Sequence, residues 1–322
     1  MDHETELAKL VDGFRLYCLA EGKQRTTIRW YLGKLRIFLD YLRAEQLLTC
    51  PSEVTTTHLR AFLVHLREEV KADENNPRKP TQERGLRTDT LQGYARTLKA
   101  FFSWMAREGY VAGDPAKAIR IPKGTKAIVK ALSDAQVSSL LSVIDLRSPK
   151  GFRDHCLLLV LLDTGIRLSE LVNLQVKDID LERGFFKVLG KGARERLVPF
   201  GAKVQTSLWK YLHKHRPRPF HPNVGNLFLR TDGQPLTPDQ VYRLIRDYGE
   251  KAGLEGVRCS PHTFRHTFAK SFLLNGGDLF TLQKILGHSS LSVVRLYVDL
   301  TADDVQVQHR LHSPVDSMKI KV

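Results

Sequence analysis

Apolar side chains recur every three or four residues in the first part of the chain, which is the spacing of one helix face. Three such stripes predict three amphipathic helices, over residues 28–42, 59–66 and 91–105. Thr90 is the expected N-cap of the third helix and Gly109 its expected C-terminal stop. The aromatic residues of this third stripe are expected in the core, while Arg96, Lys99 and Arg107 lie off the stripe. The pattern predicts a small all-helical domain.

Two polar segments interrupt this pattern. Residues 71–87 contain two prolines and a glycine among charged residues, which predicts a loop. Residues 112–130, AGDPAKAIRIPKGTKAIVK, predict an extended basic linker and a domain boundary.

The second half of the chain mixes two periodicities. Ser133 or Asp134 can cap a helix that runs through Ile144, and an apolar helix is predicted over 152–162. Short β-like segments follow at 185–189, 196–200 and 227–229, the first two joined by a hairpin-like turn, GKGA. Helices are predicted again at 238–252, 262–274, 279–286 and 291–297. This half is therefore expected to be α+β.

Charge adds the first indication of a partner. The 322 residues include 50 Lys and Arg against 35 Asp and Glu, a net charge of +15. The excess is dense in residues 76–130, with 12 basic against 4 acidic residues. Such a surplus favours a polyanion, either nucleic acid or an anionic membrane surface. Arg96, Lys99, Lys123 and Lys126 in this segment are the predicted DNA contacts, and two basic domains on a basic tether could enclose a duplex.

Other classes are less compatible with the sequence. The longest apolar run, residues 156–162, is far too short for a membrane span, and the acidic N-terminus is unlike a signal peptide. Four scattered cysteines without a CxxC pair argue against a disulfide framework. These features predict a cytoplasmic protein with free thiols.

Candidate chemistry is concentrated in four short motifs: TGIRLSEL, GKGARERLVPF, SPHTFRHTFA and LGHSSLSVVRLY. Together they supply the side chains that phosphoryl transfer requires. Two guanidinium groups can clamp the charged oxygens of a phosphorane-like transition state, and an ammonium can protonate a leaving alkoxide. A tyrosine hydroxyl, with a reference pKa of about 10, can act as the nucleophile. The residues concerned are Arg167, Lys191, His262, Arg265, His288 and Tyr297. Without a carboxylate cluster, the set is consistent with a reaction that uses neither metal nor another cofactor.

These motifs, in this order, resemble the tyrosine recombinases, the phage integrase family that includes the Xer and Cre enzymes. The resemblance implies a mainly α fold with a small β-sheet: a helical, SAM-like core-binding DNA-binding domain (1–120), a basic linker (121–131), an α+β catalytic domain (132–310) and a C-terminal tail (311–322). It implies that Arg167 and Arg265 bind the scissile phosphate, Lys191 protonates the 5′-hydroxyl, His262 and His288 assist, and Tyr297 forms a 3′-phosphotyrosine. Glu170 matches the acidic residue that supports the first arginine.

The same resemblance implies a biological setting. Such enzymes recombine double-stranded DNA at inverted-repeat half-sites through a Holliday junction, as tetramers and without ATP, with a second recombinase or accessory protein in some systems. A nucleoid-associated enzyme, of a mobile element or of the Xer kind, fits this pattern. Val293 and Val294 stand where many members have threonines, and Val298 where Xer enzymes often have histidine, which weakens assignment to the housekeeping Xer subgroup.

Two alternatives share much of this pattern: a catalytically silent DNA-binding regulator on the same fold, and a type IB topoisomerase. The six intact residues argue against the first, and the second histidine and compact N-terminal domain argue against the other. Cys259, His262 and His266 have a zinc-like spacing but lack a fourth ligand, so no metal site is predicted, and His266 is interpreted as structural. Residues 262–286 also resemble a helix-turn-helix reader.

Overall fold

The computed structural model describes residues 6–46, 50–70, 85–124, 130–190 and 195–287, together with residues 306, 309, 310 and 313. The chain divides into two compact units, Met1–Lys126 and Ala127–Val322. In the described part, no helix is both long enough and apolar enough to cross a membrane.

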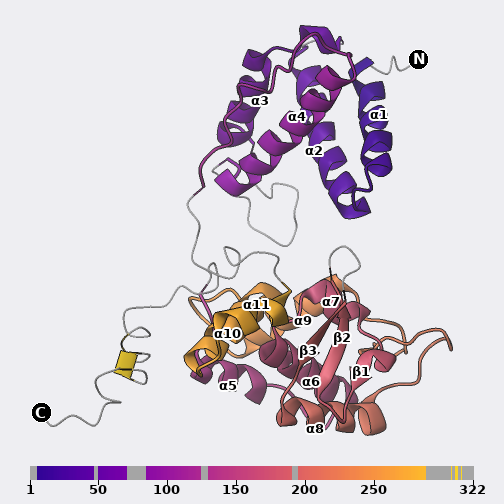
Figure 1. Cartoon of the computed structure of the whole chain (residues 1–322), viewed down its shortest axis with the longest axis vertical. Coiled ribbons are helices and arrows are strands. Elements are labelled where there is room, and N and C mark those ends of the chain that lie inside the picture. Colours follow the sequence, from indigo (N-terminus) through magenta and orange to yellow (C-terminus); the bar gives the residue numbers. More distant parts are fainter. Residues whose placement is uncertain are drawn as a thin grey trace, which may run out of the picture. The chain divides into compact units, whose positions relative to one another are not determined.

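The N-terminal unit is a bundle of helices (Figure 1). It consists of α1 (Glu6–Ala20), α2 (Arg25–Ala44), the short 3-10 helix η1 (Pro51–Glu53), α3 (Thr56–Glu68) and α4 (Thr88–Arg107). Its core combines aliphatic residues with a cluster of aromatic rings, of which Phe14, Phe38, Phe62, Phe101 and Phe102 are almost fully buried. Phe14 and Phe101 pack edge to face, with their ring centroids 5.4 Å apart, an arrangement that suits the quadrupoles of aromatic rings. The aromatic residues of α4 are therefore core residues, as the sequence predicted.

Three of these four α-helices were predicted, but α1 was not. The predicted start of α4 was wrong, because its N-cap is Arg87 and Thr90 lies inside the helix. Gly109 does lie just after the end of α4, with a φ of +79° that suits glycine.

The linker prediction for 112–130 was wrong in its first half. Ala116 and Ile119 are buried in the core of the N-terminal unit, and residues 115–118 form a turn. Lys99 of α4 holds this turn, since its Nζ donates to the carbonyl oxygens of Ala116, Lys117 and Ile119 at 2.9–3.0 Å. Residues 115–119 are therefore folded onto the N-terminal unit.

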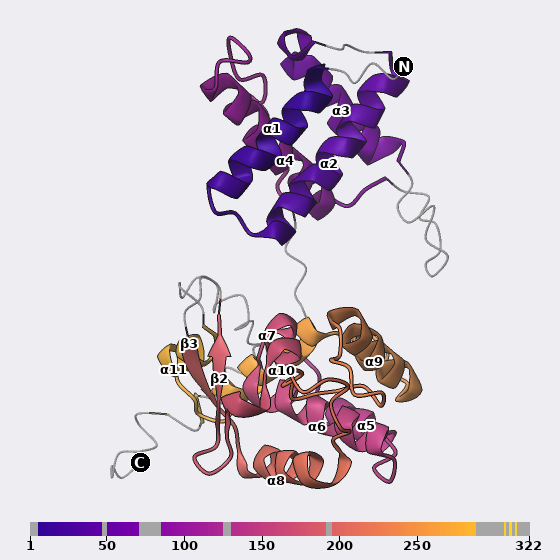
Figure 2. The same ribbon diagram turned by 90° about the vertical axis from the view of Figure 1, so that its right-hand side faces the viewer.

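The second unit surrounds the long buried helix α6 (Pro149–Thr164) (Figure 2). The other α-helices are α5 (Asp134–Ser142), α7 (Leu168–Asn173), α8 (Ala202–Lys210), α9 (Pro238–Lys251), α10 (Pro261–Leu274) and α11 (Leu279–Leu286). Two short helices of other types are also present, the 3-10 helix η2 (Val176–Asp178) and the π-helix η3 (Tyr211–His215). A three-stranded antiparallel sheet is formed by β1 (Ile179–Asp180), β2 (Phe185–Leu189) and β3 (Glu195–Pro199), in that order.

The sheet and helices follow the sequence patterns with some exceptions. The strand predicted at 185–189 is β2, and the strand predicted at 196–200 is β3 shifted by one residue. The strand predicted at 227–229 was wrong, because this buried segment makes only isolated bridges at Asn226 and Leu229. The helix predicted at 291–297 lies outside the described residues. The fold is nevertheless the mainly α architecture with a small sheet that the sequence predicted.

Candidate active site

Arg167 lies at a sharp junction between two helices. Gly165 ends α6 in the left-handed conformation, with φ +57°, and Arg167 is the N-cap of α7. Its backbone N–H donates to Glu170 Oε2 at 2.9 Å, while its Nη1 pairs with Glu170 Oε1 at 2.9 Å. Nη2 reaches the Gly287 carbonyl at 3.3 Å. The three-residue spacing of Arg167 and Glu170 thus forms a half-buried ion pair that also caps a helix.

Glu170 has a second partner that the sequence did not identify. Arg196, on β3, donates from Nη1 and Nη2 to the two carboxylate oxygens at 2.8 Å each. Its Nε donates to the carbonyl of Ile285 at 2.9 Å. Burial alone would raise the pKa of Glu170, but the hydrogen bonds from Arg196 and Arg167 outweigh it and hold the pKa below its usual value. Glu170 is therefore a buried carboxylate at neutral pH.

Arg265 is held in the first half of α10 and is only 4% exposed. Its Nη1 donates to the carbonyl of Gly165 at 2.6 Å, and its Nη2 donates to the carbonyl of Leu286 at 2.8 Å. These carbonyls belong to the C-terminal ends of α6 and α11, which carry partial negative charge. The contacts orient the guanidinium and stabilise its charge.

His262 lies in the first turn of α10, three residues before Arg265, and is exposed to solvent. Reduced hydration by the surrounding protein, and then repulsion from Arg265, lowers its pKa. The neighbouring His266 is buried, with its ring centroid 6.1 Å from that of His262. Burial, followed by His262 and Arg265, lowers the pKa of His266 to about 4. Both shifts favour the neutral form of the ring.

Arg167, His262 and Arg265 line one cleft of about 480 Å³. The cleft is completed by Ile166, Leu168, Tyr242, Arg258, Ser260 and Pro261. Arg258 is a third guanidinium in this cleft and donates to the Tyr242 hydroxyl, with its Cζ 5.9 Å from the centre of that ring. Sequence reasoning missed Arg258 and Tyr242. The closeness of a basic residue to the SPH motif was the only available signal.

Three of the predicted catalytic residues, Lys191, His288 and Tyr297, lie outside the described residues, and so does Lys126. Within the described ranges, the structure brings together Arg167, Glu170, His262 and Arg265. No three His, Cys, Asp or Glu side chains in these ranges are grouped closely enough to hold a metal ion, and this includes the Cys259, His262 and His266 set.

The predicted DNA contacts of the N-terminal unit have different environments. Arg96 and Lys123 are exposed, and Arg96 donates a 3.3 Å hydrogen bond to Gln92 within its own helix. Lys99 instead uses its ammonium to hold the turn after α4, as described above. Its role in DNA binding stays a prediction beside this structural role.

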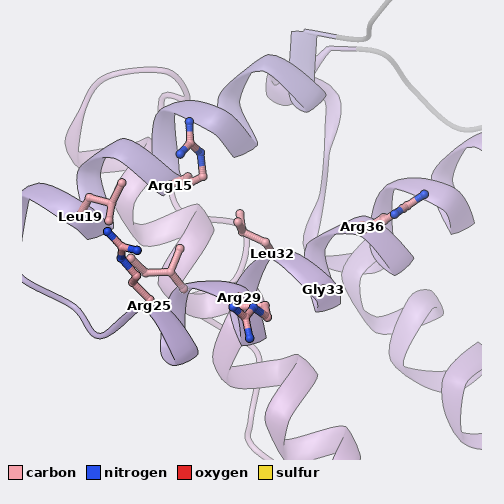
Figure 3. A pocket seen from close by; sticks show the side chains of 8 residues that line it. Arg15, Leu19, Arg25, Arg29, Leu32, Gly33 and Arg36 are labelled. Carbon is pink, nitrogen blue, oxygen red and sulfur yellow. The ribbon is translucent and has the colours of Figure 1, made fainter. Parts of the chain in front are cut away.

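A groove between α1 and α2 carries further arginines that the sequence reading did not select (Figure 3). Its volume is about 540 Å³, and its apolar lining of Leu19, Ile28 and Leu32 is flanked by Arg15, Arg25, Arg29 and Arg36. These residues fall in a part of the sequence where acidic residues balance basic ones overall. The fold gathers these cations from two helices along one groove. Residues 15–36 carry six basic side chains against one acidic, so a charge count over this shorter segment was the available signal.

The arrangement in the catalytic half suits one chemical task. A cleft with three guanidinium groups and a neutral imidazole can bind a phosphate and neutralise charge on its oxygens. The neutral imidazole can also accept a proton near that phosphate. The site therefore has the groups expected for phosphoryl transfer.

Comparisons with known proteins agree with this chemistry. Residues 130–304 match the model of the phage integrase family. The chain is 32% identical to tyrosine recombinase XerD of Listeria innocua over 295 residues, which cover 91% of this chain and 94% of that protein. It is 34% identical to tyrosine recombinase XerC of Oceanobacillus iheyensis over 314 residues, covering 96% and 97%. The structure of the XerH recombinase on palindromic difH DNA has the same fold, with a TM-score of 0.70 and 23% identity over 92% of this chain and 82% of that one.

These matches define a class of site-specific DNA recombinases. The chain belongs to the phage integrase family, and within it to the tyrosine recombinases of the Xer type.

Proposed function

We propose that this enzyme breaks and rejoins duplex DNA at specific sites through a covalent 3′-phosphotyrosine intermediate. The observation that carries the proposal is the common cleft of Arg167, His262 and Arg265, in which two guanidinium groups and an imidazole can surround one phosphate. Arg167 and Arg265 bind the non-bridging oxygens of the scissile phosphate and stabilise the charge that develops on them.

The proposed reaction is a transfer between two oxygen atoms. The hydroxyl oxygen of Tyr297 attacks phosphorus, and its proton passes to a histidine, for which the lowered pKa of His262 makes a neutral acceptor available. The bond from phosphorus to the 5′-oxygen breaks, and Lys191 protonates that oxygen. His288 contributes to phosphate binding. In the second half, a 5′-hydroxyl from another strand attacks the phosphotyrosine, and Holliday-junction exchange follows without ATP or metal.

A nicked duplex that releases its 5′-hydroxyl fragment tests the nucleophile. The wild-type protein should accumulate a protein–DNA adduct that survives denaturant, and Tyr297→Phe should form none. Tyr110→Phe, a change at an exposed tyrosine of the N-terminal unit, is the matched control and should form the adduct. An equal yield from Tyr297→Phe would refute the assignment, and DNA binding without any wild-type adduct would support a silent regulator. EDTA should leave the yield unchanged.

We also propose that the N-terminal unit holds the DNA backbone. The arginines of the α1–α2 groove, with Arg96, Lys123 and Lys126, supply cations that release counterions when they meet phosphates. Replacing Lys123 and Lys126 together with glutamine should weaken binding and make the dependence of affinity on salt less steep. An unchanged affinity and slope would exclude the linker from the interface.

The assembly is proposed on the same basis. Four subunits on DNA with inverted-repeat half-sites would account for paired strand exchange, and the palindromic DNA of the XerH structure supports two-fold sites for this family. Selection from a random duplex library by covalent capture would reveal the half-sites. Relaxation of supercoiled DNA without site preference or junction products would favour a topoisomerase. The setting proposed is the cytoplasmic nucleoid.

A further inference from the structure

Glu170 joins two arginines that differ in their access to the cleft. The side chain of Glu170 is 5% exposed and that of Arg196 13%, whereas the side chain of Arg167 is 35% exposed. Only Arg167 of these three lines the cleft. The buried end of this ion-pair chain therefore lies behind the residue proposed to bind phosphate.

We propose that Arg196 is a positioning residue for phosphoryl transfer. Arg196 neutralises the charge of Glu170 and fixes its side chain, so that Arg167 keeps the charge and the orientation it needs to bind the scissile phosphate. The inference rests on the proposed function, since it assigns a role in holding the same phosphate. Arg196 touches neither DNA nor the reacting atoms in this role.

The geometry at the carboxylate supports the proposal. Arg196 takes one acceptor position on each oxygen of Glu170, at 2.8 Å, in a two-pronged pairing that suits guanidinium and carboxylate. Arg167 donates to the remaining acceptor positions: its backbone N–H bonds Oε2, and a single guanidinium nitrogen bonds Oε1. Because Arg196 occupies both oxygens, Arg167 makes only one side-chain hydrogen bond to the carboxylate.

Charge leads to the same conclusion. Arg167 and Glu170 alone form a neutral pair, so a phosphate in the cleft would meet little net charge from them. With Arg196 the three groups carry a net charge of +1, and the least buried member is Arg167. Electrostatic interactions are weakly screened in such a partly buried site.

Arg196 also connects the elements around the site. Its Nε bond to the Ile285 carbonyl ties β3 to the last turn of α11, and Figure 2 shows these two elements side by side. A Cβ on Gly287 would lie 3.0–3.1 Å from the Arg196 side chain, so the glycine permits this close approach. The Gly287 carbonyl in turn accepts from Arg167. One guanidinium thus sets the relative positions of α7, β3 and the end of α11.

The chain contains a matched control for a purely structural ion pair. Arg153 pairs with Asp154 through two nitrogens, both side chains are at most 7% exposed, and neither residue lines the cleft. Disruption of this pair, in which both nitrogens donate to Asp154 Oδ1, removes another buried arginine–carboxylate ion pair from the same unit. A loss of fold stability alone should therefore affect the Arg153 and Arg196 variants in the same way.

The test compares two nicked duplexes in single-turnover cleavage at saturating protein. One has an ordinary scissile phosphate, and the other has a methylphosphonate, in which a methyl group replaces a charged oxygen. For Arg196→Gln we expect DNA affinity within about threefold of wild type, but cleavage of the charged phosphate slower by about 10- to 100-fold, the scale of a misplaced catalytic group. On the methylphosphonate the defect should shrink to about threefold or less, because less charge needs neutralisation.

Controls separate the possible causes. Arg196→Lys retains the charge and should recover part of the rate, whereas Arg153→Gln and Arg153→Lys should change both substrates equally. Circular dichroism at the assay temperature identifies folded variants, and if Arg196→Gln does not fold, Arg196→Lys against Arg153→Lys gives the same comparison. A wild-type rate for folded Arg196→Gln, or an equal defect on both substrates, would overturn the inference. Failure of wild type to form any Tyr297 adduct would instead overturn the proposed function.

Discussion

Gly165→Ala should destabilise the catalytic unit more than the same change at another glycine with similar backbone geometry. Gly165 has φ +57°, a conformation that costs an L-residue about 1 kcal/mol or slightly more. A Cβ there would lie 2.4 Å from Phe268 Cδ1 and 2.9 Å from Leu286 Cδ2, both in the core. Overpacking of this kind costs about 1–3 kcal/mol, so the total is about 2–4 kcal/mol.

Gly253 supplies the matched control in the same unit. Its φ is +63°, and a Cβ there would meet nothing within 4 Å. Gly253→Ala should therefore lose only the conformational part, about 1 kcal/mol. Urea unfolding of the two variants, followed by circular dichroism, gives the difference directly. Equal losses in the two variants would refute the packing argument.

Cleavage gives a second measurement on the same pair of variants. The Gly165 carbonyl accepts a 2.6 Å hydrogen bond from Arg265, so displacement of Gly165 should disturb the proposed phosphate-binding group. At a temperature where both variants are folded, Gly165→Ala should cleave a nicked duplex more slowly than Gly253→Ala. Equal rates would show that the position of this carbonyl does not limit the reaction.

Three further predictions concern other parts of the chain. Arg258→Gln should weaken DNA binding and reduce the salt slope by about 1 if this cleft cation meets a phosphate, as measured by titration at several salt concentrations. Burial, and then His262 and Arg265, lowers the pKa of His266 in the folded protein to about 4, against an ordinary 6.5. The neutral ring therefore contributes its full stabilisation above pH 6.5, and this contribution decreases toward pH 4 by at most about 3 kcal/mol. His266→Gln should make the unfolding free energy less dependent on pH in this window, and parallel pH curves would contradict this. Gly33→Ala should stabilise the N-terminal unit by up to about 1 kcal/mol in thermal unfolding, because alanine has the higher helix propensity and the added Cβ inside α2 would meet nothing within 4 Å. A loss of stability would contradict this argument.

The sequence predicted elements where one face is buried and the ends carry clear signals. β2 alternates buried and exposed residues, and the N-cap of α10 is Ser260, whose hydroxyl accepts from the Thr263 N–H. α1 was missed although Leu7, Phe14 and Cys18 have helical spacing, because the exposed Leu16 and Leu19 obscure the stripe. The segment 227–229 is buried throughout, and an apolar run of three residues cannot distinguish a strand from an extended connection.

The sequence predicted those parts of the candidate site whose residues lie close together along the chain. Arg167 with Glu170, and His262 with Arg265, are each three residues apart at the start of a helix. Arg196 was missed because its partners lie 26 and 89 residues away, and only the tertiary fold brings them together. A signal did exist: Arg196 alternates with exposed Glu195 and Leu197, on the same face of β3 as the buried Val198. A cation on the buried face of a strand requires an acidic partner.

The glycines of two motifs explain how Arg265 keeps a charge while buried. A guanidinium that is 4% exposed loses most of its hydration, which must be replaced by acceptors. The acceptors are the Gly165 and Leu286 carbonyls, at the ends of helices that terminate in left-handed glycines, Gly165 and Gly287. Such ends leave carbonyls without helical partners and concentrate negative partial charge. TGIR and LGH therefore supply two helix ends that bind the two terminal nitrogens of Arg265, so a change at either glycine should affect the proposed phosphate binding without a direct contact to DNA.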